Sequence, residues 1–180
     1  RAARVAQSLR PAGYDAEVIY LVTLLQNLGR MAVQYHFPDE AHQIRRLMQP
    51  APAAKEGEPD EPGMSEEGAA FAVLGTDLDA LGVAIARHWG LDGSVQHMLR
   101  RHSPGAPVRM PDTDDDMLRT TASCANECVD ALGRPAAQVL PALQRVLQRY
   151  GRALNLTLKD LQLALEMLPP GAAEAARRTA

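Results

Sequence analysis

Two cysteines lie close enough along the chain to share chemistry. Cys124 and Cys128 are four residues apart, which places both thiols on one face of a helix. Thiolates bind zinc well, but a tetrahedral site needs four ligands, and no second Cys or His pair is placed to supply the others. The spacing therefore predicts a buried pair of free thiols rather than a metal site.

The histidines and the acidic clusters do not have the spacing of metal sites either. His36 and His42 are six residues apart and His97 and His102 are five apart, neither of which puts two ligands on one helix face. The acidic residues at 56–67 and 112–116 lack the alternating order and the closing Glu of a calcium loop. We expect both acidic segments to be solvated.

Three arginines predict a basic stripe on one helix. Arg145, Arg149 and Arg152 follow one another at steps of four and three residues, so they share a helix face. Such a stripe is usually solvated, and the alternative is a docking surface for an acidic partner.

These residues belong to a chain of 180 residues whose composition favours helices. Hydrophobic residues make up 46% of the chain, Ala, Leu and Arg are abundant, and β-branched runs of strand length are nearly absent. We therefore expect an all-α fold. The length suits one globular domain, large enough to bury a core without disulfides or a structural metal.

Charge and hydropathy exclude several classes of partner. The formal charge is −3 and aromatic residues make up 4% of the chain, which argues against a generally basic nucleic-acid binder. No apolar run approaches the ~18 residues of a membrane span, and the first residues lack the apolar segment of a signal peptide. With only 2 cysteines, we expect a reducing, cytoplasmic environment.

The helix expected to matter most spans 15–35. Asp15 can cap it, and its apolar residues recur at steps of three and four, so we expect a central helix that is buried on most sides. Pro38 fits the first turn of a short helix that ends near 48. The segment 49–64 combines prolines with acids and predicts a long solvated loop.

The rest of the chain predicts further helices with recognisable ends. Ser65 can start one helix, Thr76 and Asp79 can form a capping box for the next, and Gly90 can end it. Later helices are expected over 93–101, 116–132, 136–150 and 157–168, the last opened by a capping box in TLKD. We expect a single bundle of seven to nine helices over 1–168 and a frayed tail over 169–180.

Several segments resemble the sequence patterns of the HD superfamily. LVTLLQNLGRMAVQY resembles a metal-site helix with the pattern LLHDIGK, and GTDLDALGVAIARHWGLDGSVQHMLRRHSP is similar to a stretch typical of HDOD domains. TTASCANECVDALG resembles the alanine–aspartate helix of that family, and together the matches cover 1–132. The resemblance implies an all-helical relative of metal-dependent phosphohydrolases, usually a signalling or output module attached to kinase, receiver or cyclic-dinucleotide-related domains.

The positions that bear metal ligands in the HD pattern carry other residues here. In that pattern, imidazole nitrogens and carboxylate oxygens hold two cations that activate water against a phosphate. The residues that replace them are Gln26, Asn27, Leu78, Arg101 and Asn126, and His102 alone remains of a His-His pair. Amides are weak ligands and a guanidinium repels a cation, so we expect no metal, no cofactor and no catalysis.

Arg30 suggests a second interpretation of these positions. It stands three residues beyond Asn27, where active relatives have lysine. If Arg30, Arg101 and His102 converge, their charges would suit a phosphate or carboxylate of a small ligand. The alternative is that Arg30 pairs with a surface acid and the amides bond buried backbone groups.

These observations lead to three hypotheses about function. The first is a non-catalytic regulatory module of a bacterial signal-transduction protein, a pseudoenzyme that binds a partner domain, for example a kinase in the same longer chain, or an anionic small ligand. The second is a divergent phosphohydrolase acting on a phosphoester or cyclic nucleotide. The third is a helical scaffold that dimerises through exposed Leu and Met on its last two helices.

Overall fold

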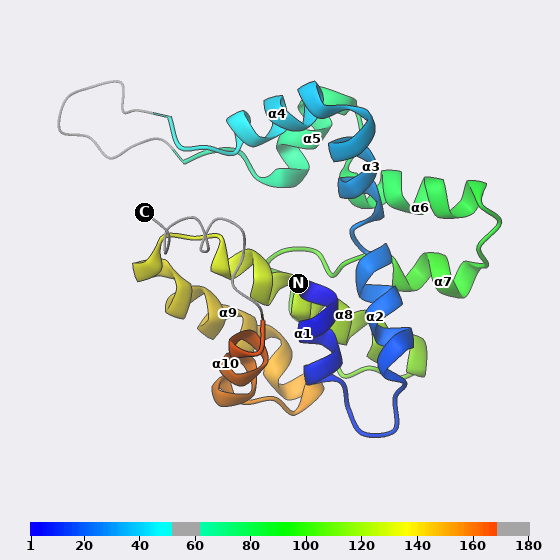
Figure 1. The fold of residues 1–180 in the computed structure, drawn as a ribbon, viewed down its shortest axis with the longest axis vertical. Coiled ribbons are helices and arrows are strands. Elements are labelled where there is room, and N and C mark those ends of the chain that lie inside the picture. The colour runs from blue at the N-terminus through cyan, green and yellow to red at the C-terminus, as the bar shows by residue number, and fades with distance from the viewer. Residues whose placement is uncertain (52–61, 169–180) are drawn as a thin grey trace. The chain divides into compact units, whose positions relative to one another are not determined.

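The computed structural model describes residues 1–51 and 62–168, and these residues form ten helices (Figure 1). The all-α class is confirmed. The described helices exceed the expected seven to nine because α1 was not predicted and the helix over 15–35 is two helices. Their bounds are α1 Ala2–Leu9, α2 Ala16–Leu25, α3 Leu28–His36, α4 Pro38–Leu47, α5 Glu66–Leu74, α6 Leu78–His88, α7 Gly93–Met98, α8 Asp114–Leu132, α9 Ala136–Leu154 and α10 Leu158–Glu166.

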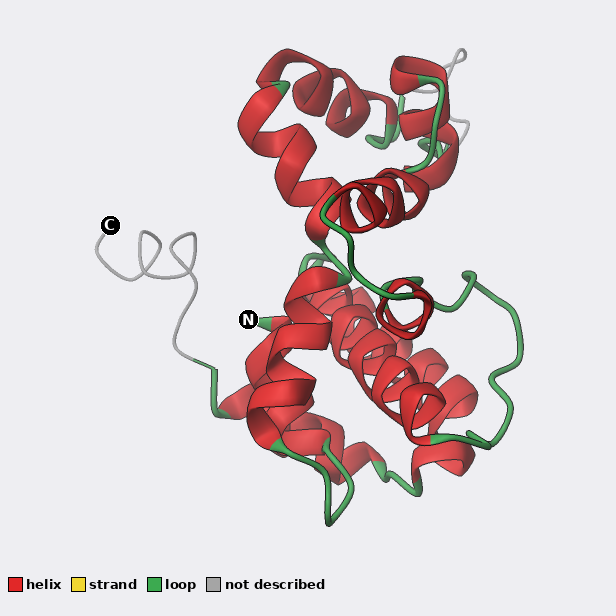
Figure 2. Ribbon diagram, turned by 90° about the vertical axis from the view of Figure 1, so that its right-hand side faces the viewer, coloured by secondary structure: helices red, strands yellow, loops and turns green. Residues whose placement is uncertain are grey.

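The chain divides into two compact units. The first unit comprises 1–24 and 101–180 and includes α1, α8, α9 and α10, while α2 ends at its boundary. The second unit comprises 25–100 and includes α3 to α7. Helices account for most of the described residues in both units (Figure 2). The single domain expected over 1–168 stays a prediction.

The core of the first unit is built around α8. This helix packs against α1 and α9, and α10 contacts α1, α8 and α9. Because neighbours cover α8 on more than one side, it buries polar side chains as well as apolar ones. Its buried polar residues are Thr120, Thr121, Ser123 and Asn126.

The second unit buries small and aliphatic side chains in two clusters. Helix α3 packs against α6, and α4 packs against α5. One cluster contains Val33, Ala41, Ile44, Ala69, Ala70 and Leu78. The other contains Leu28, Val83, Ala86 and Leu99. Both clusters lie entirely within 25–100, so this unit has a hydrophobic core of its own.

The prediction of one helix over 15–35 is wrong, because the chain breaks between α2 and α3 at Gln26 and Asn27. At the break, the buried Gln26 side chain donates a hydrogen bond from Nε2 to the carbonyl of Met98 at 2.9 Å. Asn27 leaves helical geometry with φ −102° and ψ 8°, and its carbonyl accepts the first hydrogen bond of α3, from Met31. The apolar residues keep their helical spacing across residues 26 and 27, so this periodicity does not indicate the break.

The predicted burial of this segment is also wrong for α2. Val18, Tyr20, Leu21 and Leu24 are between 39% and 53% exposed. The buried residues of α2 are Ile19, Val22 and Thr23. A helix that is apolar on all sides does not indicate by its periodicity which face is covered, so only the packing decides this.

A glycine permits the closest contact in the second unit. A Cβ atom on Gly29 would lie 1.9 Å from the Leu78 carbonyl oxygen and 2.9 Å from the Gly82 nitrogen. Both are backbone atoms of the α6 region, which cannot move aside as a side chain can. Helices α3 and α6 can therefore pack this closely only because position 29 has no side chain.

Several helix ends carry the caps predicted from sequence. The Ser65 hydroxyl accepts a backbone N–H bond in the first turn of α5, and the Asp15 carboxylate accepts two in the first turn of α2. Thr157 and Asp160 form the reciprocal capping box of α10. Gly90 follows α6 with φ +76°, the left-handed conformation in which many helices end.

The capping box predicted between Thr76 and Asp79 is wrong. Asp77 is the N-cap of α6, and its carboxylate accepts a hydrogen bond from the backbone N–H of Ala80 at 2.7 Å. Thr and Asp are both good N-caps, so the local sequence does not separate the two registers. Asp79 lies in the first turn of α6, where its carboxylate binds Arg30 instead.

Other boundaries differ from the predicted ones by a few residues. Helix α8 begins at Asp114 because the Thr113 hydroxyl caps it, accepting from the backbone N–H of Asp116 at 3.1 Å. Helix α9 extends to Leu154, and α7 ends at Met98. The loop over 49–64 is described only at its ends, and the tail over 169–180 lies outside the described residues.

Within the part of the chain that the structure describes, no helix by itself has the length and apolarity that crossing a membrane requires. Helices α5 and α6 together are long and apolar enough by length and composition alone, but the chain bends by 63° between them.

Candidate functional site

The residues at the HD motif positions are divided between the two units. Gln26, Asn27 and Leu78 belong to the second unit, and Arg101, His102 and Asn126 belong to the first. The predicted convergence of Arg30 with Arg101 and His102 joins residues of different units, so it stays a prediction.

In the second unit, two of the motif positions contribute to packing. Gln26 is 2% exposed and uses its amide nitrogen to satisfy the Met98 carbonyl. Leu78 is 7% exposed and belongs to the cluster around Val33 and Ala69. Gln26 thus behaves as the alternative interpretation expects, with its amide bonded to a buried backbone group.

Arg30 is held by two carboxylates of the same unit. Its Nε donates to both oxygens of Glu66 at 3.0 Å, and its Nη2 also contacts Glu66. Its Nη1 donates to Asp79 Oδ1 at 2.6 Å. The guanidinium group therefore connects α3 to the first turns of α5 and α6. We call these three residues the Arg30 triad.

The Arg30 triad carries a net negative charge. Burial alone would lower the pKa of Arg30, but the hydrogen bonds and charges of Glu66 and Asp79 outweigh burial and raise it. The guanidinium is therefore always charged, and each of the two carboxylates uses part of its binding capacity. These contacts match the interpretation that Arg30 pairs with acids and leave it poorly suited to bind an additional anion.

In the first unit, His102 is held against α8 and α9. Its Nε2 lies 3.0 Å from Thr120 Oγ1, and its backbone N–H donates to Ser123 Oγ at 3.4 Å. Its ring packs edge-on against Tyr150, with the ring centres 6.1 Å apart. Thr120 and Ser123 are three residues apart on α8, so a single helix face supplies both contacts.

Arg101 and Asn126, the other two motif positions of this unit, also lie against α8. Arg101 Nη1 donates to Asp130 Oδ2 at 3.1 Å, and the Arg101 carbonyl accepts from Arg119 at 3.4 Å. Asn126 is 2% exposed within α8. The Arg101 guanidinium is thus paired with a carboxylate on α8.

An arginine clamp lies next to His102 and was not predicted. Arg149 binds both carboxylate oxygens of Glu127, and its Nη2 and Nε donate to the carbonyls of Ser103 and Ala106 at 2.8 and 3.2 Å. Tyr150, which is fully buried, donates its hydroxyl to Glu127 at 2.6 Å. A Glu inside a helix of small residues was the available signal. We call Glu127, Arg149 and Tyr150 the clamp.

The clamp changes the interpretation of the basic stripe on α9. Arg145 and Arg152 are exposed, whereas Arg149 between them is turned onto Glu127 and the backbone after His102. Burial and the negative charge of Glu127 raise the pKa of Tyr150, so its hydroxyl stays protonated and donates. Arg149 therefore serves the fold, and the three arginines do not form a continuous solvated stripe.

The cysteines are free and buried, as predicted. The hydrogen bond with Cys128 and burial raise the pKa of the Cys124 thiol well above its usual value. A thiol that resists deprotonation is a poor nucleophile and a poor metal ligand. The pair accordingly behaves as core packing.

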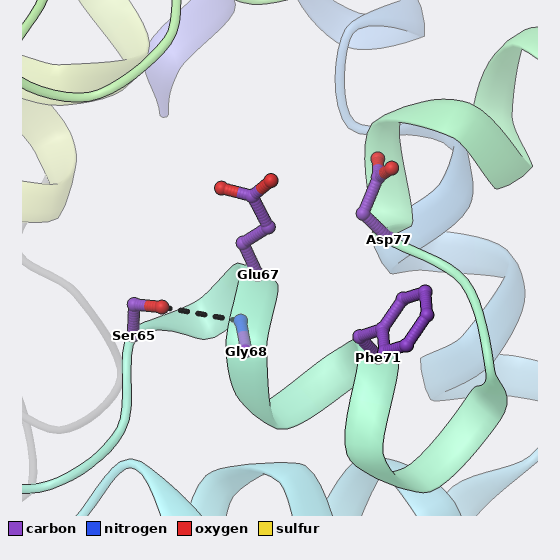
Figure 3. A pocket seen from close by; sticks show the side chains of 5 residues that line it. All are labelled: Ser65, Glu67, Gly68, Phe71 and Asp77. Atoms are coloured by element: carbon purple, nitrogen blue, oxygen red, sulfur yellow. Dashed lines mark hydrogen bonds between the residues drawn. The ribbon is translucent and has the colours of Figure 1, made fainter.

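Two surface hollows are lined by residues other than the candidate site residues described above. One of about 480 Å³ is lined by Ser65, Glu67, Gly68, Phe71 and Asp77, where α5 and α6 begin (Figure 3). Its carboxylates are first-turn and N-cap residues, which helix dipoles favour without any ligand. Another, of about 420 Å³, is lined by Arg4, Gln7, Glu17 and Tyr20 in the first unit.

Comparison with protein-family models identifies the family. Residues 1–104 of the 180 match the HDOD domain. The chain belongs to the HDOD family. The match places this HDOD domain among the HD-related domains associated with signalling. It ends before α8, so the resemblance of 120–133 to the alanine–aspartate helix remains a prediction. No curated protein and no solved structure matches the chain.

The residues of this HDOD domain do not fit the metal ions that the HD resemblance implies. Leu78 has no donor atom, and the Gln26 side chain is bonded through its amide to a backbone carbonyl. Across residues 1–51 and 62–168, no group of three or more His, Cys, Asp or Glu side chains has the arrangement of a metal site. At positions 26 and 78, the imidazole and carboxylate donors of the HD pattern are absent.

Proposed function

We propose that this HDOD domain is a non-catalytic signalling module that acts by binding a partner domain or protein. The observation that carries the proposal is the use of Gln26 and Arg30. Both stand in the motif helix segment, and both bind groups of the second unit: the Met98 carbonyl for Gln26, and Glu66 and Asp79 for Arg30.

The chemistry of hydrolysis supports the same proposal. Metal-assisted hydrolysis of a phosphoester needs cations to activate water and to stabilise charge on the phosphate. At the motif positions, leucine supplies no donor, arginine repels a cation, and the neutral amides are weak ligands, so His102 is the one strong donor that remains. A divergent phosphohydrolase would need a different set of ligands.

The same contacts favour a macromolecular partner over a small anion. A phosphate-binding pocket needs positive charge that is not already neutralised. Arg30 is paired with two carboxylates and Arg101 with one. A partner domain, for example a kinase within a longer chain, does not require that charge.

A retention experiment tests the non-catalytic role. The purified chain is incubated with manganese, iron or zinc, desalted and analysed for metal by mass spectrometry, and hydrolysis of bis(p-nitrophenyl) phosphate is followed in parallel. We expect no stoichiometric metal and no turnover above buffer. The comparison protein is the variant that restores ligands at three positions, Gln26→His with Asn27→Asp and Asn126→Asp.

The opposite result has a clear form. Stoichiometric metal in the natural chain, together with turnover that Asn27→Ala removes, would contradict the proposal and favour the phosphohydrolase.

A helical scaffold is a second candidate, because apolar side chains are exposed on the last two helices. Leu140 in α9 and Leu163 in α10 are 47% and 48% exposed, and Met167, the residue after α10, is 76% exposed. Light scattering over a range of concentrations separates this candidate from the first. A dimer that Leu140→Ser or Leu163→Ser dissociates would support it, and a monomer at every concentration would exclude it.

A further inference from the structure

The Arg30 triad joins α3 to α5 and α6, two consecutive helices that follow it at a distance in sequence. Arg30 lies in α3, Glu66 is the first residue of α5, and Asp79 lies in the first turn of α6. The guanidinium meets Glu66 side-on through Nε and Nη2 and reaches Asp79 through Nη1. A single planar guanidinium group thus donates hydrogen bonds to two carboxylates through different N–H groups.

The geometry separates this triad from an ordinary surface ion pair. Single exposed pairs contribute little because water screens them and long side chains lose entropy. Here the side chains of Arg30, Asp79 and Glu66 are 23%, 28% and 36% exposed, and the contact to Glu66 is bidentate. Two carboxylates that share one cation would repel each other if it were removed.

We infer that Arg30 is a built-in cation, which fills a site formed by Glu66 and Asp79 and so keeps α3, α5 and α6 packed without a metal ion. Both carboxylates bind the same guanidinium, which meets Glu66 with one edge and Asp79 with another nitrogen. A lysine has one compact ammonium group and cannot present separate N–H donors along two edges. The inference concerns the second unit alone and does not depend on the proposed function.

Thermal and denaturant unfolding of the full chain tests the coupling. In double-mutant cycles of Arg30→Met with Glu66→Gln and with Asp79→Asn, we expect each pair to show a coupling of at least about threefold in the equilibrium constant of unfolding. Arg30→Lys should lie between the natural chain and Arg30→Met in stability. Equal stability of Arg30→Lys and Arg30→Met, or additive effects in both cycles, would overturn the inference.

Chemical rescue tests whether the site accepts a cation. Arg30→Gly removes the guanidinium and leaves both carboxylates in place. Millimolar methylguanidinium or Mn²⁺ should raise the melting temperature of this variant. Neither should do so for the matched control Arg152→Ala, whose arginine is exposed on α9, nor for Arg30→Gly combined with Glu66→Gln and Asp79→Asn. Rescue that is absent, or equal in the controls, would overturn the inference.

The natural chain provides the last arm of the test. Because its site already contains Arg30, we expect neither Mn²⁺ nor a chelator to change its melting temperature. A stabilisation by Mn²⁺ that Glu66→Gln and Asp79→Asn abolish would show that the carboxylates accept metal beside Arg30, which contradicts the inference. If Arg30→Gly does not fold, the Lys and Met variants and this arm still decide the question.

Discussion

Several buried or half-buried polar side chains have partners within their own unit. The Gln26 amide bonds the Met98 carbonyl, and the Glu127 carboxylate receives the Tyr150 hydroxyl and the Arg149 guanidinium. Leaving a buried polar group unsatisfied costs about 1–3 kcal/mol, so such contacts constrain the fold although each contributes little net stability. The effect of removing one partner is therefore larger than the value of the bond.

Replacing Gln26 by leucine should destabilise the domain by about 1–3 kcal/mol, because the buried Met98 carbonyl loses its donor. Urea unfolding measures the change. The matched control is Gln148→Leu, since Gln148 is exposed on α9 and substitutions at such positions change stability by less than about 0.5 kcal/mol. Equal effects of the two substitutions would show that the Gln26 bond does not hold the α2–α3 break.

The cysteines should resist alkylation in the folded chain. The raised pKa of Cys124 keeps its thiol protonated at pH 8, and both side chains are inaccessible. We expect iodoacetamide to react slowly with the native chain and quickly in urea, as mass spectrometry can follow. Rapid labelling of the native chain would contradict the buried-pair assignment.

The raised pKa of the Cys124 thiol also predicts how the stability of the fold changes with pH. A raised pKa in the folded state means that the unfolded chain loses its proton first as pH rises. The contribution of Cys124 is therefore fully present below the unfolded thiol pKa and is lost as pH rises above it. Cys124→Ser should therefore reduce the loss of stability at alkaline pH, as urea unfolding at a series of pH values can measure.

Between elements, the contact of α3 with α6 allows the least change. Both helices contribute to the two apolar clusters of the second unit, and their backbones meet at Gly29. Helices usually pack with side chains between them, so a backbone contact brings their axes closer than side chains would permit.

Gly29→Ala should destabilise the domain by about 1–3 kcal/mol, since the added methyl would lie 1.9 Å from the Leu78 carbonyl oxygen. In a helix without such a backbone contact, replacing glycine by alanine would stabilise the helix. Gly93→Ala is the matched control, because a Cβ there meets nothing within 4 Å and φ is not positive. Urea unfolding followed by circular dichroism compares the stability of the two variants. A loss of stability in Gly93→Ala but not in Gly29→Ala would refute the packing argument.

Over the whole molecule, the chain forms two compact units, of which one is continuous in sequence. Residues 25–100 contain both apolar clusters and the complete Arg30 triad. The other unit is assembled from two separate segments, 1–24 and 101–180. Only the continuous unit can be excised as a single fragment.

The fragment 25–100 should fold by itself, because its core residues and the triad are all internal to it. At this size we expect a marginal stability of a few kcal/mol, with a cooperative thermal transition measured by circular dichroism. The fragment with Gly29→Ala should melt at a lower temperature. A helical signal without a cooperative transition would show that the second unit depends on the rest of the chain.

The local sequence was sufficient for the class and for many helix ends. Helix-favouring composition, side-chain caps at Ser65 and Thr157, and Gly90 at a C-terminus act within a few residues, so they can be read directly. The family was also accessible, because its motifs are linear segments. The resemblance also implies that Gln26, Asn27 and Leu78 stand where the HD pattern has metal ligands, and this stays a prediction.

Tertiary contacts decided what local signals leave open. The break at Gln26 depends on a carbonyl 72 residues away, and Asp79 joins Arg30, which lies 49 positions before it, rather than a capping box. Arg149 turns inward onto Glu127 for the same reason. The sequence by itself thus determined the helical class, many helix ends and the family. Only the tertiary structure decided what those side chains bind, since the partners are supplied by distant segments.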